Sequence, residues 1–379
     1  MYTVTNFGNM IADRIRMQAI EDALRKHVRP SSIVIDIGTG TGICALLACR
    51  LGARKVYAIE PNDAIQLARE LAAANGFSDR IEFVQGLSTS ATLGQRADVI
   101  VSDLRGTLPL YQHHILSIAD ARQRLLASGG VLIPARDSLW AAVVEAPKLY
   151  QKFAEPWEHN SYGLDLRAAR RTATNTWIRT CVKREQLLTD SFCWGTLDYC
   201  SACDPNISGE MSFLVERPGI AHGLAVWFDA VLTDGISFSN APGEPELIYG
   251  HAFFPLSVPV DLQEGDSVNV RLRADLVCKD YVWTWESQVM TQGATKAHFK
   301  QCDFFGIPLS ASQLARRAAK HIPALNEEGE IDRMILVMMD GNTTLETIAS
   351  FLYKKFPQSI KTFQEALARA GEFSLRYSR

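Results

Sequence analysis

A glycine-rich turn that directly follows a short apolar run constrains the fold of this chain more than any other feature. Residues 33–37 form the apolar run, and the turn after it reads Gly38-Thr39-Gly40-Thr41-Gly42. An apolar stretch with helical spacing begins near Ile43. Glycines allow a ligand to approach the backbone closely, and the start of a helix offers unpaired amide groups to it. The pattern predicts a strand, a ligand-binding turn and a helix.

Strand-like runs recur between residues 31 and 134 and alternate with helix-like stretches. The runs cover residues 33–35, 55–59, 81–84 and 99–101, and helical spacing covers 64–74 and 115–126. Strands separated by helical stretches of about 10 to 15 residues predict βαβ units, right-handed crossovers and a parallel sheet. The sequence therefore predicts a doubly wound, Rossmann-like α/β domain over residues 1–144.

Two acidic side chains stand at the ends of the first two predicted strands. Asp36 precedes the first glycine of the turn, and Glu60 ends the second strand, where a carboxylate can accept both hydroxyl groups of a ribose. The glycine spacing is GxGxG, whereas dinucleotide-binding proteins have GxGxxG, and this favours S-adenosyl-L-methionine over NAD. Its cationic amino group suits Asp36. A tight turn that only packs a helix on a strand would leave the two acids unexplained.

Two further loops follow predicted strands and are expected to face the same ligand. Leu87 and Ser88 follow the third strand, and Asp103 follows the fourth. In open parallel sheets, ligands bind outside the carboxyl ends of the strands. Leu87 is either a floor for the adenine ring or an ordinary core residue beside the loop.

The spacing of apolar residues changes after Pro134. Residues 268–276 alternate between apolar and polar, and Tyr281, Trp283 and Trp285 repeat at period two. This alternation predicts antiparallel strands over residues 145–298. A single long sheet would expose its edges and one apolar face, so we expect a barrel or a sandwich.

Helical spacing returns in residues 299–379. Thr343 and Glu346 have the spacing of a capping box, and Ile348, Leu352 and Phe356 then share one helical face. Three short helices predict either a small independent bundle or an appendage of the β domain.

Composition limits the partners and the compartment. Lys and Arg total 39 against 42 Asp and Glu, a formal net charge of -3, so there is no overall basic field for nucleic acid, only room for a local patch. No apolar run reaches the length of about 18 residues that a membrane span needs. Asp13 lies where the apolar segment of a signal peptide would be. We expect a cytoplasmic protein with neither a membrane nor a nucleic-acid partner.

The eight cysteines are too sparse for a disulfide scaffold. Cys200 and Cys203 form one CxxC, but tetrahedral zinc needs four ligands, and no second CxxC or close pair of histidines follows. No metal site is predicted.

These motifs resemble the protein arginine methyltransferase family over residues 1–295. Met10, Asp13 and Arg16 match the MxxDxxR pattern of the family's N-terminal helix, and residues 34–42, 52–56, 129–134 and 226–229 continue the match. The resemblance implies S-adenosyl-L-methionine as the cofactor, with Arg16 gripping its carboxylate. It also implies a Rossmann-like domain joined directly to an antiparallel β-barrel. The family commonly forms dimers through an arm inserted in the barrel, which makes a homodimer possible here, but no segment can be assigned to that arm.

The substrate-binding loop departs from the family pattern. The family's SExMGxxLxxE carries two glutamates that clamp a guanidinium, and the matching stretch here has Asp103 in the first place and Gln112 in the second, with Arg105 between them. Arginine is therefore a doubtful substrate. Asp103 is expected to orient the acceptor or take its proton, and Gln112 to hold a neutral amide, an imidazole or an amine. His113 and His114 are expected to be surface or capping residues.

The C-terminal residues 335–349 resemble the small winged-helix domain related to the peptide chaperone of pyrroloquinoline quinone biosynthesis. Domains of that kind bind leader peptides by extending a strand edge, which implies a polypeptide substrate presented by residues 299–379. A purely structural helical cap is the alternative.

The sequence thus predicts an S-adenosylmethionine-dependent methyltransferase that acts on a nitrogen, or less readily an oxygen, of a peptide or protein side chain. The alternatives are a methyltransferase for a small molecule and a non-catalytic cofactor-binding scaffold. The predicted cofactor-binding residues are Arg16, Asp36, Gly38, Thr39, Gly40, Glu60, Leu87 and Ser88, and the predicted catalytic residues are Asp103 and Gln112.

Overall fold

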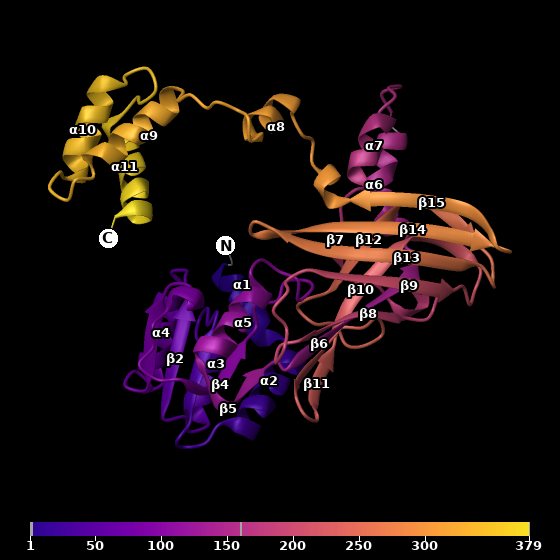
Figure 1. Ribbon diagram of the computed structural model, residues 1–379, viewed down its shortest axis with the longest axis horizontal. Coiled ribbons are helices and arrows are strands. Elements are labelled where there is room, and N and C mark those ends of the chain that lie inside the picture. The colour runs from indigo at the N-terminus through magenta and orange to yellow at the C-terminus, as the bar shows by residue number, and fades with distance from the viewer. Residues whose placement is uncertain (1–2, 160, 379) are drawn as a thin grey trace. The chain divides into compact units, whose positions relative to one another are not determined.

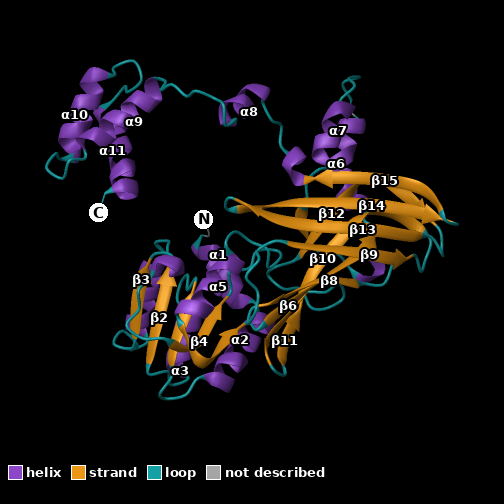
Figure 2. Cartoon of the chain, in the orientation of Figure 1, coloured by secondary structure: helices purple, strands orange, loops and turns teal. Residues whose placement is uncertain are grey.

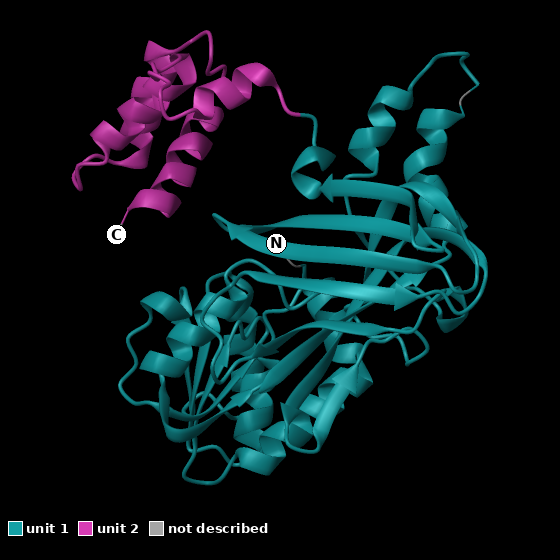
Figure 3. Cartoon of the chain, turned by 45° about the vertical axis from the view of Figure 1, so that its right-hand side comes forward, with its two compact units in different colours: residues 1–308 teal, residues 309–379 magenta. Residues whose placement is uncertain are grey.

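The structure is a computed structural model that describes residues 3–159 and 161–378. The chain divides into two compact units, residues 1–308 and residues 309–379 (Figure 3). The larger unit contains both the parallel and the antiparallel sheets, and the smaller unit is helical.

A five-stranded parallel sheet forms the first part of the larger unit, with strand order β3-β2-β1-β4-β5. Its strands are β1 (Ile33–Ile37), β2 (Lys55–Glu60), β3 (Ile81–Gln85), β4 (Ala97–Ser102) and β5 (Leu126–Ile133). The helices of this part are α1 (Val4–Ala12), α2 (Arg14–His27), α3 (Ile43–Arg50), α4 (Ala64–Ala74) and α5 (His114–Arg124) (Figure 1). The predicted parallel α/β domain is confirmed.

The strand order reverses between β1 and β4, and this positions the site. β1 pairs with β2 on one side and with β4 on the other, and each of its five residues is buried. A fully buried strand with neighbours on both sides holds its carboxyl end rigidly. Ligands of open α/β sheets bind in the crevice where the order reverses.

Two antiparallel sheets form the second part of the larger unit (Figure 2). The first has the order β7-β12-β10-β6-β8, with β11 paired to β10, and the second has the order β15-β14-β13-β9. The strands are β6 (Arg136–Val144), β7 (Ile178–Thr180), β8 (Phe192–Asp198), β9 (Ile207–Leu214), β10 (Gly219–Thr233), β11 (Ile236–Ser239), β12 (His251–Leu262), β13 (Ser267–Val277), β14 (Asp280–Thr291) and β15 (Ala294–Cys302). β6 lies inside the predicted first domain of residues 1–144, so the antiparallel part begins before residue 145. The division into three domains stays a prediction.

Side chains, not a continuous ladder, join the two antiparallel sheets. Phe254 on β12 packs against Trp283 and Trp285 on β14, with ring centroids 5.2 and 5.3 Å apart. Trp285 Nε1 also donates a hydrogen bond to the Pro255 carbonyl, 3.1 Å away. Among the described residues the strands form two separate ladders, so the closed barrel is not found, and the arrangement is the sandwich that the sequence also allowed.

A pair of helices between β6 and β7 was not predicted. These are α6 (Pro147–Glu158) and α7 (Arg167–Ala173), and Arg170 on α7 pairs with Glu158 on α6 at 2.6 Å. The two helices lie beside the antiparallel sheets rather than within them (Figure 1).

The smaller unit contains α8 (Ala311–Arg317), α9 (Glu327–Met338), α10 (Leu345–Lys355) and α11 (Phe363–Tyr377). Its core is small and comes from α9, α10, α11 and the turn before α11, with Ile331, Ile335, Ile348, Ala349, Leu352, Ile360, Ala366 and Ala370 buried. Thr344, not Thr343, caps α10, and its hydroxyl accepts a hydrogen bond from the Thr347 amide. Residues 309–378 contain no strand, so the winged-helix resemblance and its strand edge are not confirmed.

None of the helices in the described part of the chain is both long and apolar enough to cross a bilayer.

Candidate active site

A cavity of about 750 Å³ lies outside the carboxyl ends of β1, β2 and β4. It brings together every residue that the sequence assigned to the site, namely Arg16, Asp36, Gly38, Thr39, Gly40, Glu60, Leu87, Ser88, Asp103 and Gln112. Helix α1 contributes Phe7, Met10 and Ile11 to the same cavity. The roles given to these residues stay predictions.

Asp36 shapes the glycine turn from beneath. One carboxylate oxygen accepts hydrogen bonds from the Thr39 hydroxyl at 2.5 Å and from the Ala45 amide at 3.0 Å. Burial raises the pKa of Asp36 to about 6, although these two hydrogen bonds act in the opposite direction. Asp36 therefore ties the turn to the start of α3, in addition to its predicted contact with the amino group of the cofactor.

Gly40 has to be a glycine because helix α1 lies against it. Its φ is +53°, and a Cβ placed on it would come within 2.5 Å of Cε1 of Phe7. The turn and α1 thus form adjoining walls of the cavity.

Glu60 links the end of β2 to the glycine turn. One carboxylate oxygen accepts from the Gly40 amide at 3.1 Å, and the other accepts from the backbone and side-chain nitrogens of Asn62 at 3.0 and 2.7 Å. The oxygen that accepts only from Gly40 keeps lone-pair capacity for a predicted ribose hydroxyl, and the other oxygen already accepts two hydrogen bonds. Ser88 is buried beyond the next strand, whereas Leu87 is 60% exposed, so Leu87 is not a core residue.

Asp103 lies at the centre of an ion-paired cluster. Its Oδ2 accepts from Arg16 Nε at 2.7 Å, from Arg16 Nη2 and from the Tyr249 hydroxyl at 2.7 Å. Its Oδ1 accepts from Arg105 Nη1 at 3.0 Å. Tyr249 lies outside the regular strands, just before β12 of the antiparallel part, so the cluster draws on both parts of the unit.

Arg105 connects the ion-paired cluster to residues of the antiparallel part. Its Nε and Nη2 donate to the two oxygens of Asp137 on β6 at 2.9 and 2.8 Å, a bidentate pair, and the Tyr199 hydroxyl donates to Asp137 at 2.6 Å. Its guanidinium also lies over the ring of Phe228 at 5.5 Å. Paired so completely, Arg105 is a fixed charge in the wall of the cavity.

The pairing decides what Asp103 can do. Burial by itself would raise the pKa of this carboxyl, but the charges of Arg16 and Arg105 and the hydrogen bond from Tyr249 hold it well below its ordinary value. A carboxylate with such a low pKa is a weak base at neutral pH. Of the two roles predicted for Asp103, the orientation of neighbouring groups fits this environment and the uptake of a proton does not.

The end of the loop separates the next three residues. Gln112 is exposed at the rim with a φ of +44°, and its Nε2 donates to the Tyr111 hydroxyl at 3.2 Å. His113 is also exposed, and its Nε2 lies 2.7 Å from the Cys278 carbonyl. The prediction that His114 is a surface or capping residue is wrong, because only 2% of it is exposed.

Three side chains of the cluster were not predicted from the sequence, namely Asp137, Tyr199 and Tyr249. They come from the antiparallel part, and a motif reading of the parallel part gives no signal for them. One sequence feature pointed to Tyr249: residues 247–249 stand where the arginine methyltransferase family has a different loop.

Metal binding finds no support in the described part of the chain, which contains no group of three His, Cys, Asp or Glu side chains placed to hold an ion. Cys200 and Cys203 are both exposed.

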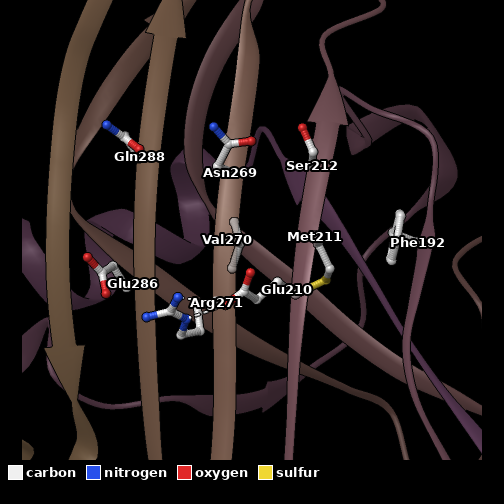
Figure 4. A pocket seen from close by; sticks show the side chains of 9 residues that line it. All are labelled: Phe192, Glu210, Met211, Ser212, Asn269, Val270, Arg271, Glu286 and Gln288. Carbon is white, nitrogen blue, oxygen red and sulfur yellow. Dashed lines mark hydrogen bonds and ion pairs between the residues drawn. The ribbon is translucent and has the colours of Figure 1, made fainter.

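A second hollow, of about 460 Å³, lies on the outer face of the four-stranded sheet (Figure 4). Arg271 lies there between two acidic side chains, and it pairs with Glu210 at 2.6 Å. None of the predicted site residues lines this hollow.

Sequence comparisons cover most of the larger unit. The model described as ribosomal protein L11 methyltransferase matches residues 14–135, and the model described as arginine methyltransferase oligomerization subdomain matches residues 135–285. A probable protein arginine N-methyltransferase 1.2 of Arabidopsis thaliana is 28% identical over 275 residues, which cover 70% of this chain and 75% of that protein. Residues 135–285 thus match a model of the arginine methyltransferases, and 70% of the chain is similar to a curated protein of that kind. Protein arginine N-methyltransferase PRMT10 of the same plant is 27% identical over 299 residues, covering 70% of this chain and 78% of the relative.

Solved structures of the family have the same fold as the larger unit. The Trypanosoma brucei PRMT1 enzyme-prozyme heterotetrameric complex with AdoHcy superposes with a TM-score of 0.73 at 22% identity, covering 78% of this chain and 96% of that chain. Arabidopsis thaliana protein arginine methyltransferase 10 superposes with a TM-score of 0.69 at 22% identity, covering 79% and 97%. These similarities confirm the predicted enzyme class, an S-adenosylmethionine-dependent methyltransferase, and its cofactor.

Proposed function

We propose that this enzyme transfers the methyl group of S-adenosyl-L-methionine to an uncharged nitrogen of a peptide or protein side chain. The observation that carries the proposal is the pairing of Asp103 with two arginines, Arg16 and Arg105. A carboxylate that already balances two positive charges has little attraction left for a third.

The side chains of the loop over residues 103–112 favour an uncharged acceptor. A guanidinium substrate would meet the shared carboxylate of Asp103, the fixed positive charge of Arg105 and the neutral amide of Gln112. Loss of one charge-assisted hydrogen bond typically costs about 1.5 to 3 kcal/mol, which corresponds to roughly 10- to 150-fold in affinity. A neutral amide, an imidazole or an unprotonated amine avoids this penalty, and Gln112 can both donate and accept hydrogen bonds to it.

The residues of the cavity have separate tasks in this scheme. The amides of residues 38–42 and the carboxylate of Glu60 would hold the nucleoside part of the cofactor. Among the described residues, Arg16 donates hydrogen bonds to Asp103, Tyr249, Met10 and Met17. One N–H of its Nη2 remains and would donate to the cofactor's carboxylate. Asp103 fixes Arg16 in that position. The sulfonium supplies the reactive methyl, and the protein supplies alignment and exclusion of water.

A peptide panel tests the proposal. Purified full-length protein is incubated with methyl-labelled cofactor and a set of peptides that differ only in the central residue, which is Asn, Gln, His, Lys or Arg. We expect label in one or more of the uncharged acceptors and at least tenfold less in the arginine peptide. Arginine as the best acceptor would overturn the proposal. So would the absence of label from every peptide under conditions in which calorimetry shows that the cofactor binds.

A further inference from the structure

The cavity wall contains a buried imidazole that none of the roles above uses. His114 is the first residue of α5, it lines the cavity, and it is 2% exposed. Neither of its ring nitrogens makes a hydrogen bond of good geometry to a described residue, although the backbone of Leu104 lies close enough to favour the protonated ring. Burying a polar group without a partner is unfavourable, so this imidazole is a candidate to bind a polar atom of the substrate.

The groups around His114 keep it neutral. Burial is the main cause that lowers the pKa of His114, to about 4, and the positive charge of Arg105 acts in the same direction. Asp137, Asp103 and the backbone of Leu104 act in the opposite direction and do not outweigh these effects. Tyr199 packs against the imidazole edge to face, with centroids 5.2 Å apart, and so holds the ring in place. A neutral imidazole offers one donor and one acceptor nitrogen.

Four other polar side chains of the cavity already have partners or lie at its rim. Asp103 balances two arginines, Asp36 and Glu60 accept hydrogen bonds from the glycine turn and its flanks, and Gln112 lies at the exposed rim. His114 is thus a buried, uncharged imidazole with an acceptor nitrogen beside the loop that carries Asp103.

We propose that a ring nitrogen of His114 accepts a hydrogen bond from the methyl-accepting side chain and directs the lone pair of the accepting nitrogen toward the sulfonium. The inference rests on the proposed function. In the step, the lone pair of the acceptor nitrogen forms the new N–C bond while the S–C bond of the sulfonium breaks, and its electron pair stays on sulfur as a neutral thioether. The proton of the acceptor nitrogen leaves to water.

Two substitutions separate chemistry from packing. His114→Phe keeps an aromatic ring against Tyr199 and removes the hydrogen-bond acceptor, and His114→Gln restores an acceptor oxygen. We expect His114→Phe to lower kcat for the best peptide of the panel about 100-fold, because the acceptor loses its alignment with the sulfonium, with the Kd of S-adenosylhomocysteine changed less than twofold. His114→Gln should recover part of the loss. His298→Phe on β15, remote from the cavity, is the matched control and should keep wild-type kcat.

A kcat for His114→Phe within threefold of wild type would overturn the inference and leave the proposed function intact. The absence of any methylated peptide with the wild-type enzyme would instead refute the proposed function. A spectroscopic measurement covers the case in which His114→Phe does not fold. In wild-type protein with ¹⁵N-labelled histidine, the His114 ring signals should shift when peptide is added to the complex with S-adenosylhomocysteine. Unchanged signals at saturating peptide would exclude the hydrogen bond.

Discussion

Asp103 shows how the surroundings of a side chain decide its role. Its position at the end of β4 is that of a group that faces a ligand, and its type suggests a base. Arg16 and Arg105 on either side keep its pKa well below the ordinary range, so it stays ionised and holds its partners in place. We therefore propose that Asp103 contributes to catalysis indirectly, by holding Arg16.

Asp103→Asn should weaken both folding and cofactor binding. The amide has the size of the carboxylate but leaves two buried guanidinium groups without its charge, and breaking a buried pair typically costs about 3 to 5 kcal/mol. We expect a loss of about 3 kcal/mol in the free energy of unfolding, measured with urea, and at least a tenfold weaker Kd for S-adenosylhomocysteine, because Arg16 loses its anchor.

The control for this change is Asp165→Asn. Asp165 pairs with Arg167 at 2.8 Å on the surface, where ion pairs contribute little, so no measurable change is expected. If Asp103→Asn bound the cofactor as tightly as the wild type, the anchoring role of Asp103 would be wrong.

At the scale of elements, the glycine turn and α1 act together. Helix α1 buries none of its residues, yet Phe7, Met10 and Ile11 line the cavity, and Phe7 approaches Gly40 closely. A helix with no buried face gains little from packing on the protein alone. The position of α1 beside the cavity therefore depends on its contact with the glycine turn and on a ligand bound between the two.

Gly40→Ala should damage cofactor binding more than stability. A Cβ at this position meets the ring of Phe7 at 2.5 Å and displaces α1 from the turn, so we expect at least a tenfold weaker Kd for S-adenosylhomocysteine by calorimetry. Gly76→Ala is the matched control. Gly76 also has a positive φ, +71°, but nothing lies within 4 Å of its Cβ position, so only the backbone strain of about 1 to 2 kcal/mol should remain. Equal Kd values for the two variants would contradict the contact with α1.

The layers of the fold could be predicted from the sequence because each has its own spacing of apolar residues. The alternation of strands and helices indicated the parallel sheet, and the period of two after Pro134 indicated antiparallel strands. Closure of those strands could not be predicted, since it depends on hydrogen bonds between edge strands. Helices α6 and α7 were missed because they are short and interrupt a long stretch of strand pattern, and α6 also contains Pro156.

The same contrast applies to the site. The rule that ligands bind at the carboxyl ends of parallel strands placed all ten predicted residues in one cavity. The sequence did not predict that Asp137, Tyr199 and Tyr249 belong to the site, because their contacts with residues 103–105 join distant parts of the chain. His114 was misjudged because a helix start is normally exposed, and here Tyr199 covers it.

At the scale of the whole molecule, residues 309–379 have a core of their own, separate from that of residues 1–308. The proposal that this unit binds the peptide substrate can therefore be tested by removing it. The predicted cofactor-binding residues and every described strand lie within residues 1–308, so the shortened chain should fold and keep its Kd for S-adenosylhomocysteine within twofold.

We expect the shortened chain to methylate peptides with a KM raised about tenfold and with kcat little changed. An unchanged KM would assign the unit a structural role only. Sedimentation velocity on both chains tests the proposed homodimer at the same time. The subdomain matched by residues 135–285 is described as an oligomerization subdomain, and it remains in the shortened chain. A monomer in both cases would contradict the homodimer.

The ion pairs from Arg16 through Asp103 and Arg105 to Asp137 connect the parallel part of the larger unit to its antiparallel part, and under the proposed function the first three residues also face the acceptor. Acceptor preference and cohesion are therefore not free to evolve separately. A directed-evolution campaign that begins by randomising positions 103–105 should mostly recover aggregated protein, whereas one that first stabilises the seam around Asp137 and Tyr199 has room to explore new acceptors.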